Sequence, residues 1–218
     1  MCGKFTQKRA FANLTRLAEA FGVDAPEDTF TPMRLAPVIA LDGNGARKSV
    51  PMRWGLVPSF ARDAADAKPH IHARAETVDV KPTFRDSFEK RRGILLASTF
   101  NEGEEVTPSR TQQYVLTPKD GAPVAIAVVW DRWKGEDGVW LLSFAMVTSA
   151  ANPPISAITD RMPALLEEND WAKWLGEEPA TQEELKAMLR PSERELDMRK
   201  AEKPKAQKPG PPEQAELF

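Results

Sequence analysis

Cys2 is the only cysteine in the 218-residue chain, and it follows the initiator Met1 directly. Because cysteine is small, removal of Met1 would leave a free α-amine beside the thiol. Both groups titrate at about pH 8 in model compounds, so each is partly nucleophilic at neutral pH. An aldehyde could condense with the amine to an imine, and the thiolate could then close a five-membered thiazolidine ring. The alternative is a disordered chain start with an incidental thiol.

A second group of reactive side chains lies in the segment His70-Ile71-His72-Ala73-Arg74-Ala75-Glu76. If this segment is extended, alternation places both histidines, Arg74 and Glu76 on one face. These are the only histidines of the chain, and with Cys2 they form the one zinc-site alternative. Paired histidines are common on exposed strands, so we expect no metal and no cofactor.

Two loops add polar groups. Glu102 follows an apolar strand, where burial could raise the pKa of its carboxyl and suit it to proton transfer. Prolines bracket the loop that carries Thr159, Asp160 and Arg161, so this loop could present Thr159 and Arg161 to a site. Alternatively, Asp160 and Arg161 form an ordinary surface pair.

The composition indicates one domain and a reducing environment inside the cell. The 24.2 kDa chain is 41% hydrophobic, which suits one good-sized core, and its single cysteine excludes an internal disulfide. No apolar run approaches the roughly 18 residues of a membrane span, and the first residues are no signal peptide. We expect a monomeric cytoplasmic protein that does not bind membranes.

Charge is distributed unevenly along the chain. The net charge is −2, but residues 47–92 hold eleven Lys or Arg against six Asp or Glu, an excess of five. A basic region on an acidic chain suits a confined nucleic-acid groove. A solvated surface of mixed charge is the alternative.

Hydrophobic periodicity predicts both helices and strands. We expect helices over 11–21, 84–92, 169–176 and 181–189, and strands over 38–41, 49–54, 93–97, 114–117, 124–130 and 140–148. Residues 24–37 contain three prolines and are predicted to be a loop. The order predicts one α+β domain, residues 1–197, with a curved, mostly antiparallel sheet and peripheral helices. Residues 198–218 are rich in Pro, Lys and Glu, and are predicted to be a disordered or surface-draped tail.

Six segments in this order resemble the SOS-response-associated peptidase (SRAP) family. They are Met1-Cys2-Gly3-Lys4-Phe5, Trp54-Gly55-Leu56-Val57-Pro58-Ser59-Phe60, Ala73-Arg74-Ala75-Glu76-Thr77, Lys81-Pro82-Thr83-Phe84, the strand before Glu102, and Asp160-Arg161-Met162-Pro163-Ala164-Leu165-Leu166. The resemblance implies a compact α+β fold that binds single-stranded DNA containing abasic sites. It also implies a covalent protein–DNA linkage, in which the N-terminal cysteine joins the ring-opened abasic aldehyde in a thiazolidine. A peptidase activity is attributed to the family as well.

This chain departs from the family at five positions. His72 replaces an Asn, Thr159 replaces a His, Gly103 and Phe60 replace aromatic residues, and Lys4 replaces an Arg without its bidentate fork. Thr159 has no group that titrates near neutral pH. We therefore expect His72 to take over part of the proton transfer with Glu102; alternatively, it only fills the Asn site as a neutral hydrogen-bonding group.

The expected function is crosslinking to abasic sites in single-stranded DNA as part of DNA repair. The expected catalytic residues are Cys2, Glu102, His72 and Thr159. The expected DNA-binding residues are Lys4, Arg74 and Arg161 for phosphates, Trp54 and Phe60 for bases, and Arg53 and Arg85 from the basic segment. Core packing is the alternative for Trp54 and Phe60. Other functions left open are a DNA-binding module with impaired crosslinking, a lyase, and a peptidase with Cys2 as nucleophile and His72 as base.

Overall fold

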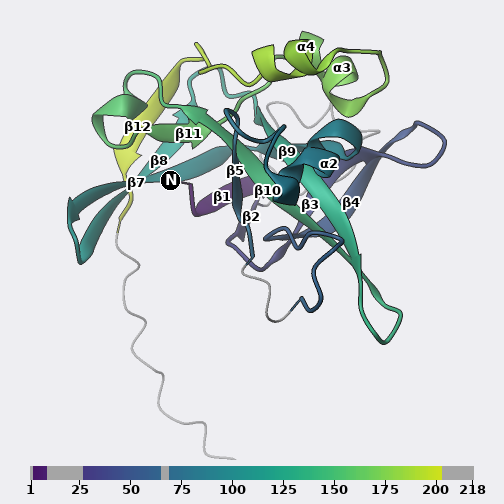
Figure 1. Ribbon diagram of the computed structural model, residues 1–218. Coiled ribbons are helices and arrows are strands. Elements are labelled where there is room, and N and C mark those ends of the chain that lie inside the picture. Colours follow the sequence, from purple (N-terminus) through teal and green to yellow (C-terminus); the bar gives the residue numbers. More distant parts are fainter. Residues whose placement is uncertain (1, 9–26, 65–68, 203–218) are drawn as a thin grey trace, which may run out of the picture.

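Two β-sheets form most of the protein (Figure 1). The computed structural model describes residues 2–8, 27–64 and 69–202. The helix predicted over 11–21 lies outside these residues. None of the described helices is long and apolar enough to cross a membrane.

The first sheet has five antiparallel strands in the order β12-β8-β7-β1-β2. These are β1 (Lys4–Lys8), β2 (Glu27–Phe30), β7 (Thr99–Thr107), β8 (Arg110–Pro118) and β12 (Leu196–Lys200). Phe5 and Gln7 of β1 point inward, as the period of two requires. The chain therefore starts in the middle of a sheet, because β1 lies between β2 and β7.

The second sheet closes on itself. It contains β11 (Arg161–Pro163), β10 (Trp140–Ala150), β4 (Arg47–Trp54), β3 (Leu35–Leu41), β6 (Arg92–Ala97) and β9 (Val124–Lys134), and β9 pairs back onto β10. A short strand, β5 (His72–Arg74), also lies along β10. Only the β10–β4 and β10–β5 pairings among the described strands are parallel. The predicted α+β class with a mostly antiparallel core is confirmed, with a small barrel beside a second sheet.

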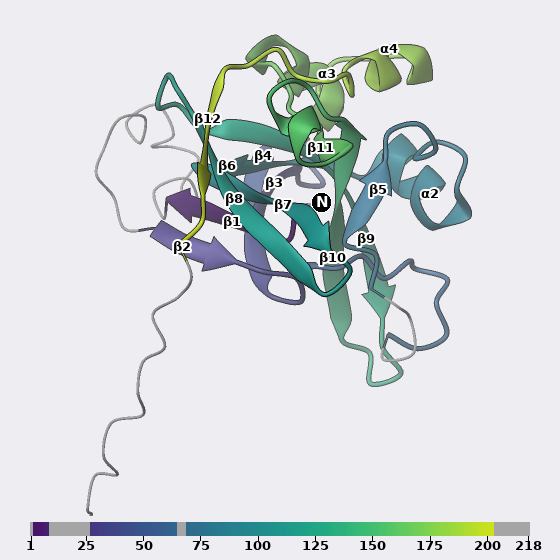
Figure 2. The ribbon, with the colours of Figure 1, turned by 90° about the vertical axis from the view of Figure 1, so that its left-hand side faces the viewer.

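Buried side chains form two clusters on opposite sides of the barrel strands. The cysteine-side cluster includes Cys2, Phe5, Trp54, Phe100 and Phe144. The helix-side cluster lies under α2 (Pro82–Lys90), α3 (Trp171–Leu175) and α4 (Gln182–Ala187), with Phe88, Trp174 and Leu185 at its centre. Short 3₁₀ turns, η3 (Ile155–Ala157) and η4 (Glu168–Asp170), complete the connections. The three helices lie together on one side of the molecule in Figure 2, so the opposite side of the barrel is left for the first sheet.

Two predictions of irregular structure were wrong in part. The predicted loop over 24–37 contains β2 and the start of β3, because Phe30 stacks on Phe5 with ring centroids 5.1 Å apart. The predicted tail begins inside β12, where Met198 pairs with Leu116 and packs against the cysteine-side cluster. Residues 203–218 of that tail lie outside the described part of the chain.

Candidate functional site

Cys2 lies two residues before the start of β1 and is fully buried in the cysteine-side cluster. Its Sγ is 3.5 Å from the Lys4 carbonyl oxygen. Strand β1 pairs with β7 so that Lys4 is opposite Asn101. The next residue along β7 is Glu102, which is buried too, so the prediction of a loop position for Glu102 was wrong. The sheet register thus brings together a cysteine and a glutamate that are 100 positions apart in the sequence.

The two groups influence each other's ionisation. Burial, and then the negative charge of Glu102, raise the pKa of the Cys2 thiol to about 12. Burial also raises the pKa of the Glu102 carboxyl to about 7, and the charge of Asp160 acts in the same direction. A backbone hydrogen bond at Cys2 opposes this rise. At neutral pH the thiol is therefore protonated, while the carboxyl is close to half ionised.

His72 reaches the same site from β5. Its ring lies 6.3 Å from the Trp54 ring in an edge-on arrangement. Burial lowers the pKa of His72 to about 4, and a hydrogen bond with the Cys2 backbone opposes this shift. The imidazole is therefore neutral at pH 7, and its Nε2 has no hydrogen-bond partner among the described residues. The lowered pKa favours the alternative of a neutral hydrogen-bonding side chain over a titrating base.

The prediction that both histidines share one face was wrong. The His70 ring lies 5.6 Å from Phe84 in the helix-side cluster, whereas His72 contacts Trp54 in the cysteine-side cluster. The strict alternation fails because β5 begins only at His72, while His70 forms a separate bridge with Leu56. No group of three or more His, Cys, Asp or Glu that could hold a metal occurs within residues 2–8, 27–64 and 69–202.

Gly55, directly after the end of β4, has a backbone conformation that favours glycine. Its φ is +131°, and a Cβ there would lie 2.9 Å from the Cβ of Pro69. The Trp54 Nε1 donates a hydrogen bond to the Ile71 carbonyl oxygen over 3.0 Å. The Trp-Gly pair therefore fixes the path of the chain that brings His72 to Cys2.

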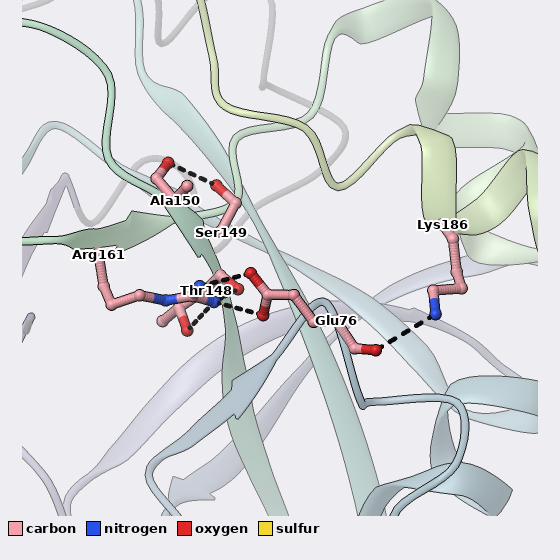
Figure 3. A network of polar contacts seen from close by, with 6 residues as sticks. All are labelled: Glu76, Thr148, Ser149, Ala150, Arg161 and Lys186. Atoms are coloured by element: carbon pink, nitrogen blue, oxygen red, sulfur yellow. Dashed lines mark hydrogen bonds and ion pairs between the residues drawn. The ribbon is translucent and has the colours of Figure 1, made fainter.

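Arg161 is the centre of a polar network (Figure 3). Its Nη1 and Nη2 donate to the two carboxylate oxygens of Glu76 over 2.5 and 2.9 Å. Nη2 also donates to the carbonyl oxygen and hydroxyl of Thr148. The network joins β11, β10 and the turn that follows β5, and Lys186 of α4 donates to the Glu76 carbonyl oxygen. The guanidinium is thus engaged within the protein, and a phosphate would have to displace Glu76.

The remaining predicted site residues separate into two groups. Lys4 and Arg74 are exposed next to Cys2 and His72 respectively, and Phe60 is 66% exposed. Trp54 is fully buried and stacks on Phe144 at 6.4 Å, so the prediction of a base-stacking Trp54 was wrong and core packing accounts for it.

Two arginines of the basic segment, residues 47–92, were predicted to bind DNA, and both lie away from Cys2. Arg53 alternates with Met52 and Trp54, which face the cysteine-side cluster, so its side chain points away from Cys2. Arg85 pairs with Asp86 on α2, which packs on the helix-side cluster. The structure does not bring Arg53 or Arg85 to the cysteine.

Thr159 lies in the loop after η3, and its backbone N–H donates to the Ile155 carbonyl oxygen. The neighbouring Asp160 is the residue whose charge raises the pKa of Glu102. Glu76 and Asp160 were expected near the candidate residues but without a role in the site, and Thr148 was not expected there. The Asp-Arg pair and the end of the strand over 140–148 were the available signals.

Cys2 and Glu102 are thus two buried groups that influence each other's ionisation, in a protein built from a small barrel and a five-stranded sheet. The chain belongs to the SOS response associated peptidase (SRAP) family, which matches residues 1–204.

Relatives and solved structures agree with this assignment. The abasic site processing protein YoqW of Bacillus subtilis is 30% identical over 199 residues, covering 88% of this chain and 87% of YoqW. The abasic site processing protein HMCES of Mus musculus is 30% identical over 168 residues, covering 63% of this chain and 48% of HMCES. A crystal structure from Bacteroides thetaiotaomicron superposes with a TM-score of 0.76 at 22% identity, over 91% and 92% of the two chains. One from Bordetella bronchiseptica gives a TM-score of 0.73 at 24% identity, over 92% and 100%. These two structures establish the fold.

Proposed function

We propose that this protein processes abasic sites in single-stranded DNA by forming a thiazolidine between Cys2 and the ring-opened aldehyde. The names of YoqW and HMCES support abasic-site processing as the general role. The observation that carries the specific chemistry is the placement of Cys2 beside Glu102, whose raised pKa of about 7 suits proton transfer in both directions.

The amine reacts first in the proposed sequence. A buried thiol whose pKa is raised to about 12 is almost entirely protonated at pH 7, so it is a poor first nucleophile. After removal of Met1, the Cys2 amine adds to the aldehyde carbon, and protonated Glu102 helps the hydroxyl depart as water. A protonated imine and a Glu102 carboxylate remain.

Ring closure then uses the same carboxylate. Glu102 accepts the thiol proton, Sγ bonds to the imine carbon, and the electron pair of the C=N π bond moves to the protonated nitrogen, which becomes the neutral N–H of the ring. One water is released for each thiazolidine formed, and no oxidant or cofactor takes part. The neutral His72 would hold the Cys2 backbone in position through its hydrogen bond. The exposed side chains of Lys4 and Arg74 would bind phosphates of the DNA backbone.

The ionisation states weigh against the cysteine-peptidase alternative. Such an enzyme needs a thiol of lowered pKa beside a histidine that accepts its proton. Here the thiol pKa is raised to about 12 and the His72 pKa is lowered to about 4.

Intact mass of the protein after incubation with abasic single-stranded DNA tests the proposal. Wild type should lose Met1 and gain the mass of the DNA minus one water, without added reductant. Cys2→Ala should give no stable adduct, although its amine could form an imine that borohydride traps. Cys2→Ser could close only a more labile oxazolidine. A stable, unreduced adduct of Cys2→Ala at wild-type yield would refute the mechanism.

A further inference from the structure

The hairpin that joins β9 to β10 carries basic and aromatic side chains that the proposed chemistry does not use. It projects away from the rest of the protein (Figures 1 and 2). The Trp140 ring lies 5.5 Å from the Arg132 guanidinium carbon and 5.5 Å from the Lys134 Nζ. We call Arg132, Lys134 and Trp140 the hairpin patch. Trp140 is 54% exposed and the preceding Val139 is 63% exposed, so the patch presents apolar surface to solvent.

The strand pairings place the patch beyond the end of the barrel. Strand β6 pairs with β9 only up to Val129, and β4 pairs with β10 only from Ser143 onward. The outer part of the hairpin therefore has only its own two strands, with Trp140 opposite Lys134 and Leu142 opposite Arg132. By alternation, the patch lies on the same face of these strands as Phe144 and Met146 of the cysteine-side cluster.

The patch cations are available to an anionic partner. Within the described residues, neither Arg132 nor Lys134 has a carboxylate at ion-pair distance. The nearby Asp131 is occupied, because its carboxylate accepts the Ser59 and Arg132 backbone N–H groups and pairs with Arg91 at 3.2 Å. Asp137 accepts the Val139 N–H within the turn. Glu136, also in the turn, is the remaining nearby acid.

The patch also adjoins the loop that carries Phe60. The Trp133 Nε1 donates to the Ala61 carbonyl oxygen over 2.8 Å, which fixes this loop against β9. A hollow of about 360 Å³ is lined by Ser59 and Ala61 together with all three patch residues. Exposed aromatic rings beside unpaired cations are the combination by which proteins hold single-stranded nucleic acid, since bases stack on the rings and phosphates contact the cations.

We infer that the hairpin patch binds single-stranded DNA a few nucleotides away from the reacting nucleotide. The inference rests on the proposed function, because it concerns the same DNA strand. Strand β10 leads from Thr148, opposite Arg74, to Trp140, which is eight residues or at most about 26 Å. This distance corresponds to about eight nucleotides at a stacked spacing of 3.4 Å, and to fewer in a stretched strand. The patch therefore lengthens the DNA-binding track on one side of the lesion.

Non-covalent binding of oligonucleotides of different lengths tests this inference. The oligonucleotides carry tetrahydrofuran, an abasic analogue without an aldehyde, with four nucleotides on each side or with ten more nucleotides on the 5′ or the 3′ side. Fluorescence anisotropy should show that one of the two extensions tightens binding to wild type about fivefold or more, which is the low end of a single stacking contact. Trp140→Ala should lose this gain, and Trp140→Phe should retain most of it.

Charge variants provide the second arm. Arg132→Gln combined with Lys134→Gln should reduce the slope of log affinity against log salt by about 1.4 for the extended oligonucleotide. The slope for the short oligonucleotide should stay unchanged. Lys48→Gln, at an exposed cation on β4, is the matched control and should change neither of the two slopes. Equal affinity of wild type for all three oligonucleotides, or an undiminished gain in Trp140→Ala, would overturn the inference. The inference would also be overturned if a polyglutamate peptide displaced the extended oligonucleotide with the same efficiency as unlabelled single-stranded DNA.

Failure of the proposed chemistry would look different. The tetrahydrofuran oligonucleotides report binding whether or not Cys2 reacts. Crosslinking of the short aldehyde-containing oligonucleotide reports the chemistry, and Trp140→Ala should crosslink it at the wild-type rate.

Discussion

Replacement of Glu102 by glutamine is the sharpest test of the site, because the structure predicts both its stability effect and its kinetic effect. Burial raises the carboxyl pKa from 4.5 to about 7. Between these two pH values the folded protein holds a proton that the unfolded chain has released. Stability therefore falls as pH rises from about 4.5 to 7, and it then levels off.

The size of the effect follows from the pKa difference. A shift of about 2.5 units corresponds to about 3 kcal/mol at 1.36 kcal/mol per unit. Glu102→Gln has the same shape but no proton to lose. We therefore expect wild type to lose about 3 kcal/mol more of its free energy of unfolding than Glu102→Gln between pH 4.5 and pH 8. Urea unfolding at several pH values measures this difference.

The kinetic part uses the same variant. If Glu102 transfers protons in imine formation and ring closure, Glu102→Gln should crosslink about 100- to 10,000-fold more slowly, and the ionisation with a pKa of about 7 should vanish from the rate profile. Glu105→Gln, at an exposed position on the same strand, is the matched control and should leave both properties unchanged. Glu102→Gln crosslinking at the wild-type rate, with an unchanged pH profile, would refute the assigned role. Identical pH slopes of stability would refute the raised pKa.

The other predictions concern the arginines and His72. Arg74→Gln should weaken single-stranded DNA binding and reduce the slope of log affinity against log salt by about 0.7. It should not change stability, because Arg74 is exposed. Arg161→Gln should instead cost about 2 kcal/mol of stability, because the guanidinium of Arg161 is bound to Thr148 and Glu76. Titrations at two salt concentrations and urea unfolding distinguish the two, and equal stability loss in both variants would contradict this division. His72→Asn should keep the rate step with a pKa of about 7, because the imidazole pKa is lowered to about 4 and the ring is already neutral. Disappearance of that step in His72→Asn, measured as crosslinking rate against pH, would restore His72 as a proton carrier.

Local sequence patterns predicted the elements that bury a continuous apolar face. The strands around 93–97, 124–130 and 140–148, and the helix at 84–92, all occur, because each is set by its own side chains. Strands β2 and β12 were missed because polar residues such as Asp28 and Asp197 interrupt their patterns. They are edge strands, and their pairing depends on β1 and β8 rather than on their own burial.

The arrangement of the candidate site could not be predicted from local patterns. Cys2 and Glu102 were predicted to be reactive from the chain start and from the preceding apolar strand, and this stays a prediction, but their proximity depends on the register of β1 against β7. The divergence of His70 from His72 depends on the bridge to Leu56, which no local pattern contains. Likewise, Arg161 was read as a free cation because its partner Glu76 lies 85 positions away in sequence.

Burial divides the site into a reacting part and a contacting part, and this division has a chemical consequence. Cys2 and Glu102 are buried and His72 is half-buried, whereas Lys4, Arg74 and Phe60 face the solvent. Oxidation and disulfide exchange require an accessible thiolate, and a buried thiol with a pKa of about 12 offers almost none. The proposed chemistry does not need a thiolate at the outset, because the amine forms the first bond and Glu102 then takes the thiol proton. In the proposed reaction, an aldehyde held next to the amine would thus use a thiol that soluble oxidants reach poorly.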